Sequence, residues 1–305
     1  MSAAATRRKG PQLTLGPVLF NWPTGTWVDF YARIADEADV DRVSVGEVVC
    51  SKRTPFRDDA LPAVIERLER AGKQVVYATL AMPTSVREMR AIAEIIEAGY
   101  LVEANDTATI HLLAGRPHVT GPFLNIYNEA ALALHLRLGA TSICLPPELP
   151  LDAVRRLAAG NAATEVLVFG RAPLAISARC YHARVHGLSK DSCQFVCERD
   201  ADGMDVQTID GRTFLAVNGV QTLGHAVTAA AHQIGDLREA GVASLRLSPH
   251  TCDMVAVARV FRGLADARIA PAEAMAHLAA LPLPGSLSDG FLRGLAGARQ
   301  VGEVD

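Results

Sequence analysis

The sequence lacks any run of about 18 consecutive apolar residues, the length that a membrane-spanning helix needs. Its first residues carry charge but no following apolar segment or cleavage site, so we expect neither a secretory signal nor an integral membrane segment. It also lacks an excess of one charge, because 30 Lys and Arg residues stand against 33 Asp and Glu residues, for a net charge of -3. This balance argues against a general binder of DNA, RNA or anionic membranes.

Cysteine is scarce, with six residues in a chain of 305. That is too few for a small fold held together by disulfides, and without a secretory signal we expect a cytoplasmic, reducing location. Clustered cysteines in that compartment are more often metal ligands or redox groups than disulfides. The six are Cys50, Cys144, Cys180, Cys193, Cys197 and Cys252.

Several common catalytic motifs are also missing. No glycine-rich dinucleotide fingerprint or phosphate loop follows an expected strand. The zinc-protease pattern HExxH, the nucleophile elbow GxSxG and the three-cysteine run of radical enzymes are absent as well. These absences exclude the usual nucleotide sites and the familiar hydrolase and radical chemistries.

Short β-branched runs alternate with segments of helical period, a pattern typical of repeated βα units and a parallel sheet. One amphipathic segment, 85–98, begins with Ser85 and Glu88 at capping-box spacing. We expect eight strands, over residues 13–20, 42–49, 74–80, 101–104, 119–126, 142–145, 165–169 and 244–247. Eight units in a chain of this length predict one α/β domain, 1–305, folded as a TIM-type (β/α)8-like barrel, with an open doubly wound sheet as the alternative.

One interval between strands is more than twice as long as the others. It separates the expected strands at Glu165 and Ser244, and it predicts an insertion over 178–223 between strands seven and eight. Within the insertion, the dipeptide Asp210-Gly211 is typical of a tight turn and predicts a hairpin around 207–215. The end of the chain, 281–305, is rich in Gly, Pro and Leu and predicts an irregular tail.

Three of the cysteines lie in this insertion. Cys193 and Cys197 are separated by three residues, which lets two thiolates face one site. Both zinc and iron-sulfur centres use such pairs. Cys180 is the candidate third ligand of the same site. Cys50 is the best fourth candidate, because it ends strand two at the carboxyl-terminal face of the barrel.

Other assignments of these cysteines remain open. Cys144 has the apolar strand context of a buried thiol, whereas Cys252 follows strand eight and could replace one of the four. His182 and His186 keep a mixed Cys/His zinc site open, with a supporting role beside the ligands as the commoner outcome. The plainest alternative is six unrelated reduced cysteines.

Polar residues at the expected strand ends form a second candidate set that could line the barrel mouth. They are Asn21, Glu47, Glu103, Asn105, Asp106, Asn125, Glu148, Arg171 and His250. Each could instead be a helix cap or a loop-fixing group, as Asp106 before Thr107 suggests. We take Arg171, Glu47 and Asn125 as catalytic candidates, and the guanidinium of Arg171 would suit a carboxylate.

Five sequence segments resemble the ubiquinone-biosynthesis branch of the collagenase-like (U-32) peptidase family. They are LGPVLFNW at 15–22, GEVVCSKR at 46–53, AGRPHVTGPFLN at 114–125, SARC at 177–180 and KDSCQFVC at 190–197. The similarity runs from about residue 12 to the end of the chain. The segment 288–294 departs from the aromatic tail of many members, so a role for that aromatic pair is in doubt here.

This resemblance implies a barrel-type fold and a 4Fe-4S cluster on Cys50, Cys180, Cys193 and Cys197. It also implies a heterodimer with a related family member and oxygen-independent hydroxylation of a ubiquinone precursor, with a sterol-carrier-type lipid-binding accessory protein. The peptidase name has no counterpart in the sequence, which supplies no nucleophile with a base. Two alternatives are an RNA-base-hydroxylating member, which the net charge disfavours, and a non-catalytic partner subunit that the cluster stabilises.

Overall fold

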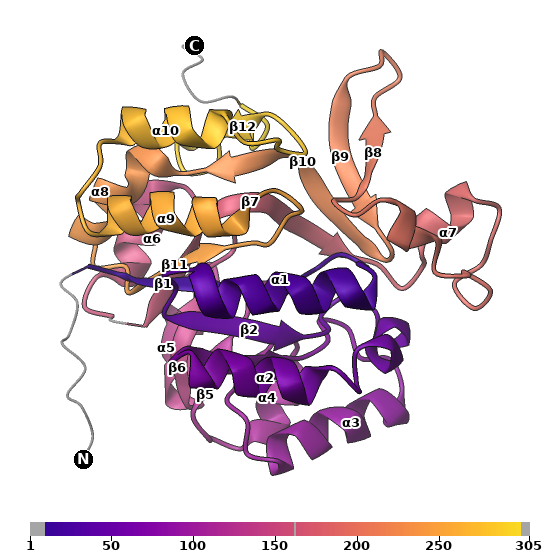
Figure 1. Cartoon of the computed structure of the whole chain (residues 1–305). Coiled ribbons are helices and arrows are strands. Elements are labelled where there is room, and N and C mark those ends of the chain that lie inside the picture. The colour runs from indigo at the N-terminus through magenta and orange to yellow at the C-terminus, as the bar shows by residue number, and fades with distance from the viewer. Residues whose placement is uncertain (1–9, 162, 300–305) are drawn as a thin grey trace.

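A closed barrel of eight parallel strands forms the centre of the molecule (Figure 1). The computed structural model describes residues 10–161 and 163–299. The strands are β1 (Gln12–Leu15), β2 (Arg42–Gly46), β3 (Gln74–Ala78), β4 (Val102–Ala104), β5 (His118–Thr120), β6 (Ala140–Cys144), β7 (Thr164–Ile176) and β11 (Ser244–Leu247). Neighbours pair in sequence order, and β11 closes the ring by pairing in parallel with both β7 and β1. The barrel prediction is confirmed, and the open-sheet alternative is wrong.

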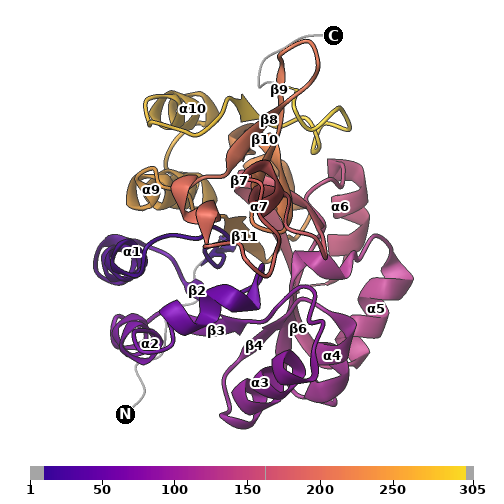
Figure 2. The same cartoon turned by 90° about the vertical axis from the view of Figure 1, so that its right-hand side faces the viewer.

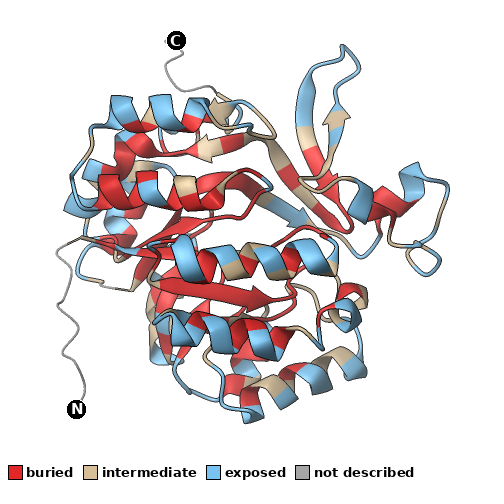
Figure 3. Cartoon of the chain, in the orientation of Figure 1, coloured by how far each residue is buried: buried red, intermediate tan, exposed pale blue. Residues whose placement is uncertain are grey.

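Helices cover the outside of this sheet, as Figure 2 shows. Because the strands are enclosed between the helices and the barrel interior, strands such as β2 are buried along their whole length (Figure 3). The helices between the strands and after β11 are α1 (Thr24–Glu37), α2 (Leu61–Arg70), α3 (Val86–Glu97), α4 (Thr107–Leu113), α5 (Glu129–Arg137), α6 (Leu151–Ala158), α8 (Ile234–Glu239), α9 (Met254–Ala265) and α10 (Pro271–Ala279). The capping box of Ser85 and Glu88 is present at the start of α3.

Four expected strands, at β1, β2, β3 and β5, end at least two residues earlier than their apolar runs suggest. At β5 the reason is Gly121-Pro122, which starts a 3-10 turn, η2 (Pro122–Leu124), and proline cannot donate to a sheet. At β2 the reason is Gly46, with φ +102, where a Cβ would lie 2.5 Å from the carbonyl oxygen of Ala78. At β1 the chain leaves the sheet after Leu15. The segments beyond these strand ends form the loops of the carboxyl-terminal face.

Between β7 and β11, the chain from α7 (Tyr181–Val185) to the beginning of β10 (Gln221–Ala229) projects from the barrel (Figure 1). This segment also contains a 3-10 turn η3 (Val196–Arg199), β8 (Met204–Gln207) and β9 (Thr213–Asn218). The expected hairpin is confirmed, since β8 and β9 pair antiparallel around the Asp210-Gly211 turn. Strand β7 continues past the barrel to Ile176, where β10 pairs antiparallel with it. This pairing joins the cysteine-bearing segment to the barrel wall.

The chain end packs against β10 through a short strand, β12 (Leu287–Ser288). Residues 300–305 of the expected tail lie outside the described residues. Within the described part of the chain, no helix is both long and apolar enough to cross a membrane.

Candidate functional site

Four cysteines line one hollow of about 350 Å³ at the junction of the barrel with the projecting segment. Cys50 lies between β2 and the 3-10 turn η1 (Ser51–Phe56), and Cys180 is the residue that caps α7. Cys193 and Cys197 lie on the loop before η3 and within it. Cys180 and Cys197 are buried, and the other two are half-buried. The structure therefore brings together the four cysteines selected from the sequence.

Glu47 positions the backbone of Cys50. Its Oε1 accepts hydrogen bonds from the N–H groups of Val49, at 2.8 Å, and Cys50, at 3.0 Å. Its Oε2 accepts from Arg57 Nη1 at 3.2 Å. Glu47 was a catalytic candidate, but its carboxylate is buried and engaged in these bonds, so it holds the Cys50 loop in place.

The loop that carries Cys193 and Cys197 has an unusual backbone. Gln194 and Phe195 are consecutive non-glycine residues in the left-handed region, with φ of +48 and +53. Such residues each cost on the order of 1–2 kcal/mol and persist where the surroundings enforce them. The ring of Phe195 packs edge-on against Phe56, with centroids 4.7 Å apart. This geometry turns both cysteines into the same hollow.

Asn218, at the end of β9, ties the hollow to its surroundings. Its buried amide nitrogen donates to the carbonyl oxygens of Cys197, at 2.9 Å, and Asp200, at 2.8 Å. Its Oδ1 accepts from Arg53 Nη2 at 2.6 Å and from the N–H of Asn21 at 3.2 Å. One fully bonded amide thus connects the cysteine loop, η1 and the segment after β1.

Three cationic side chains, Lys52, Arg53 and Lys190, line the hollow with the cysteines. Burial acts to lower the pKa of the Arg53 guanidinium, but Glu47 and the thiols of Cys197 and Cys50 outweigh it and raise the pKa. Gly219 is required at this point, because a Cβ there would lie 2.5 Å from Arg53 Nη2. The hollow therefore surrounds its sulfurs with positive charge, which stabilises thiolates.

Burial raises the pKa of the Cys50 and Cys180 thiols, so a metal must displace their protons. Cys180 Sγ also accepts a hydrogen bond from the N–H of Ala183 at 3.4 Å. Hydrogen bonds of this kind stabilise a thiolate and tune the potential of a bound cluster.

The donor set at this hollow suits an iron-sulfur cluster. Four cysteines line it together with Lys52, Arg53 and Lys190. A four-iron cluster gives each of four cysteines its own iron. The four thiols and the surrounding cations therefore fit a 4Fe-4S cluster.

The other two cysteines lie away from this hollow. Cys144 ends β6, and burial raises the pKa of its thiol well above the usual range. Cys252 lies before α9, with its Sγ 3.7 Å from Met254 Sδ, in a separate hollow lined by Trp22 and Phe30. Burial raises the pKa of Cys252 to about 12. Cys252 therefore does not replace any of the four cysteines at the hollow.

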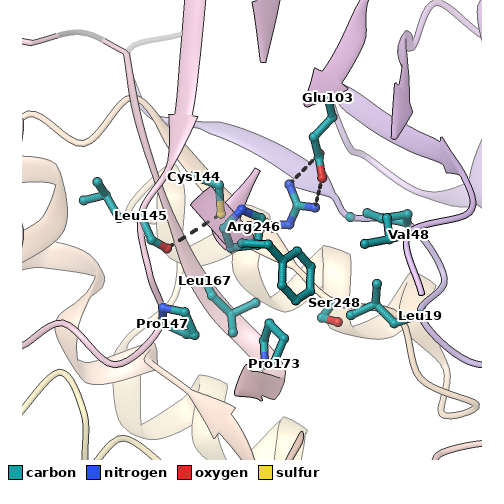
Figure 4. Close-up of a pocket in the computed structure, with 14 residues that line it drawn as sticks. Leu19, Val48, Glu103, Cys144, Leu145, Pro147, Leu167, Pro173, Arg246 and Ser248 are labelled. Atoms are coloured by element: carbon teal, nitrogen blue, oxygen red, sulfur yellow. Dashed lines mark hydrogen bonds and ion pairs between the residues drawn. The ribbon is translucent and has the colours of Figure 1, made fainter. Parts of the chain in front are cut away.

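A second, narrow hollow lies at the carboxyl-terminal mouth of the barrel (Figure 4). Its walls are mainly apolar and come from seven of the barrel strands and the loops that follow them. Its lining includes Leu19, Val48, Phe123, Leu145, Pro147, Leu167 and Pro173. Glu103 and Arg246 provide charge, and Cys144 contributes its thiol. We call this hollow the barrel-mouth pocket.

Arg246 on β11 carries the charge at the base of this pocket. Its guanidinium forms a bidentate pair with Glu103, with both N···O distances 2.9 Å, and a third bond to Glu165 Oε1 at 2.8 Å (Figure 4 shows the Glu103 pair). Arg42 lies 3.9 Å from Glu165. The charges of two arginines and two glutamates therefore balance. An apolar pocket whose charged groups sum to zero suits an uncharged ring.

Sequence reasoning missed Arg246. The available signal was an arginine inside the buried run SLRL at 244–247, since a buried charge needs a partner. Glu103 was in the strand-end set, and the structure brings it to the pocket. Asp106 caps α4, as its position suggested.

The remaining catalytic candidates lie outside the lining of the barrel-mouth pocket. The Arg171 guanidinium donates to the carbonyl oxygens of Asp202, at 2.6 Å, and Pro284, at 2.7 Å, and lies 3.5 Å from Asp205 Oδ1. Asn125 is exposed, with φ +55, and ends η2. Arg171 therefore joins β7 to the projecting segment and the chain end.

A shared apolar wall separates the two hollows. Leu19, Val48 and Phe123 line the barrel-mouth pocket and belong to the same apolar cluster as Cys50 and Cys180. A group bound in the cysteine hollow and a ligand in the pocket would therefore both contact this apolar cluster.

Two tryptophan synthase chains are among the solved structures to which this chain is similar. A chain of the Mycobacterium tuberculosis enzyme is similar with 12% identity and a TM-score of 0.39, covering 88% of this chain and 93% of that chain. The A-subunit from Pyrococcus furiosus is similar with 10% identity and a TM-score of 0.29, covering 89% and 99%. The family profile of peptidase family U32 matches residues 25–299. The chain therefore belongs to peptidase family U32.

Proposed function

We propose that this chain is the iron-sulfur subunit of an oxygen-independent hydroxylase in anaerobic ubiquinone biosynthesis, the role of the protein UbiV. It would work as a heterodimer with a UbiU-like protein, with a sterol-carrier-type accessory protein delivering the ubiquinone precursor. The observation that carries the proposal is the meeting of Cys50, Cys180, Cys193 and Cys197 at one hollow among cationic side chains. Membership of family U32 is consistent with it.

The residues around the two hollows have defined parts in this proposal. Lys52, Arg53 and Lys190 offset the charge of thiolates at the cysteine hollow. A bound cluster would supply electron transfer there. The apolar walls of the barrel-mouth pocket would hold the precursor ring and exclude water, with Leu19 and Val48 separating it from the cysteine hollow.

Peptidase activity is not part of the proposal, despite the family name. The His250 and Asp202 pair, 3.0 Å apart, resembles the base and its orienting acid in a hydrolase triad. However, His250 is buried, and its Nε2 accepts the N–H of Arg171 at 2.9 Å. This nitrogen is therefore not available to activate a nucleophile.

The test is iron and sulfide quantification with an absorption spectrum on anaerobically prepared chain, alone and with its partner. We expect about four irons and four sulfides per chain. The Cys193→Ala variant should lose them, and the matched Cys252→Ala variant should keep them. A colourless chain that holds zinc in place of iron would overturn the proposal.

A second measurement separates catalysis from a purely structural role. If the cluster takes part in hydroxylation, Cys193→Ala should abolish product formation while the heterodimer still elutes intact in size-exclusion chromatography. Equal loss of the heterodimer and of activity would instead favour a subunit whose cluster only stabilises docking.

A further inference from the structure

Two histidines and an aspartate meet at the outer side of the cysteine-bearing segment. His182 lies on α7, His186 directly follows that helix, and Asp200 directly follows η3. One ligand atom of each lies within 4.8 Å of the other two, the only such group of three or more in the described parts of the chain. The two imidazole rings stack with centroids 5.6 Å apart and 21° between their planes.

His182 is oriented as metal ligands usually are. Its side chain is fully buried, and its Nδ1 lies 3.3 Å from the carbonyl oxygen of Val217, which fixes the ring and directs Nε2 to the other side. Nε2 is 2.9 Å from Asp200 Oδ2, yet it makes no well-aligned hydrogen bond. An imidazole nitrogen and a carboxylate oxygen facing each other in this way are placed as two donors to one ion.

The backbone of the carboxylate ligand is also held in place. The carbonyl oxygen of Asp200 accepts hydrogen bonds from Asn218 Nδ2, at 2.8 Å, and from the N–H of Gly203, at 2.9 Å. Val217, which orients His182, is the neighbour of Asn218 on β9. One strand therefore positions both ligands, which lowers the cost of ordering them around an ion.

We propose that His182, His186 and Asp200 form a second metal site, which binds one divalent transition-metal ion of the Zn²⁺ or Fe²⁺ class. Two imidazoles and one carboxylate suit ions of this borderline character, and three protein ligands leave positions open for water or a small ligand. His186 is exposed, so the ion can enter from solvent.

The site would brace the segment that carries the cysteines. His182 is two residues after Cys180, and Asp200 is three residues after Cys197. An ion held by both would therefore link the two ends of the cysteine-bearing segment without using any of the four sulfurs. The proposal does not depend on what the cysteine hollow binds.

The test is equilibrium dialysis of the anaerobically prepared holoprotein against Zn²⁺, with zinc, iron and sulfide measured in the same samples. We expect one zinc per chain with iron and sulfide unchanged. His186→Ala should weaken zinc binding at least tenfold, and so should Asp200→Asn. The matched control is His111→Ala, which removes an exposed histidine from α4 and should bind zinc as the wild type does.

His186→Ala is the decisive variant, because its exposed side chain can be removed without disturbing the fold. Its iron and sulfide should equal those of the wild type. Zinc binding of equal affinity in the wild type and His186→Ala would overturn the site. Absence of zinc binding to the wild type at about millimolar Zn²⁺ would overturn it as well.

Discussion

The barrel-mouth pocket and the cysteine hollow both contain buried charge, but they satisfy it differently. At the pocket, Arg246 and Arg42 are matched by Glu103 and Glu165, so the charges cancel within the strands that carry them. At the cysteine hollow, Lys52 lies on η1 and Lys190 on the loop before Cys193, and Arg53 donates mainly to Leu19 and Asn218. The pocket is electrostatically complete without a ligand, whereas the hollow becomes so when its thiols ionise.

The largest expected effect is at the barrel-mouth pocket, where the buried charges are already paired. Arg246→Met leaves Glu103 and Glu165 buried without their main cation, so the free energy of unfolding should fall by about 3–5 kcal/mol in denaturant titrations. Adding Glu103→Gln and Glu165→Gln should recover most of the loss. The control is Arg70→Ala, at an exposed pair with Glu66, which should change stability by less than about 1 kcal/mol. A loss that small for Arg246→Met would show that the pocket charges are not coupled.

The second largest effect is expected at the cysteine hollow. Asn218→Ala removes the amide that bonds Arg53, Cys197 and Asp200, which leaves buried polar groups unpaired. We expect a loss of about 1–3 kcal/mol in the free energy of unfolding and faster release of iron to a chelator. Asn128→Ala, which removes the cap of α5, should lower stability by about 1 kcal/mol without changing iron release. Equal iron release in both variants would contradict the role given to Asn218.

The smallest effect concerns a hydrogen bond that ties the Cys50 loop to α3, which we call the tether. In it, Ser51 Oγ donates to Glu88 Oε1. Burial acts to raise the pKa of Glu88, but hydrogen bonds from Ser51, Thr84 and Ser85 outweigh it and lower the pKa to about 2. A depressed carboxyl pKa stabilises the fold above the unfolded value of about 4.3 and loses that contribution as the pH falls towards 2. Because Glu88 is only half-buried and solvent screens its charge, we expect Glu88→Gln to cost only about 1 kcal/mol at pH 7.

The pH dependence provides the measurement for this tether. The difference in the free energy of unfolding between wild type and Glu88→Gln should shrink as the pH falls from about 5 to about 2. It is measured by denaturant titration at each pH. The matched control, Glu94→Gln on the exposed side of the same helix, should show a difference near zero throughout. A Glu88→Gln difference that stays constant with pH would refute the tether.

Much of the barrel could be predicted from the sequence, because apolar period and turn residues are local signals. The capping box at Ser85 and Glu88 and the hairpin around Asp210-Gly211 are of this kind, and both are confirmed. The limits of β2 and β5 were less predictable. They depend on close backbone approach at Gly46 and on the turn at Pro122, whereas the apolar runs continue past both.

The same distinction between local signals and long-range contacts applies to the functional residues. Cysteine spacing and the expected barrel were enough to select Cys50 with Cys180, Cys193 and Cys197, because strand ends meet on one face. The partners of Glu47 and Arg171 could not be read in this way, since they come from distant segments. The structure shows Glu47 bonded to the Cys50 loop and Arg171 bonded to the carbonyl oxygens of Asp202 and Pro284.

The sequence by itself determined the barrel, the projecting segment and the choice of four cysteines, because periodicity, turn chemistry and residue type act over short stretches of chain. Only the tertiary structure decided what each buried charge does. A charge inside a protein is satisfied by whichever partner the fold brings within a few ångströms. For Arg246 that partner is Glu103, on a strand 143 residues away in the chain, and no local pattern encodes that distance.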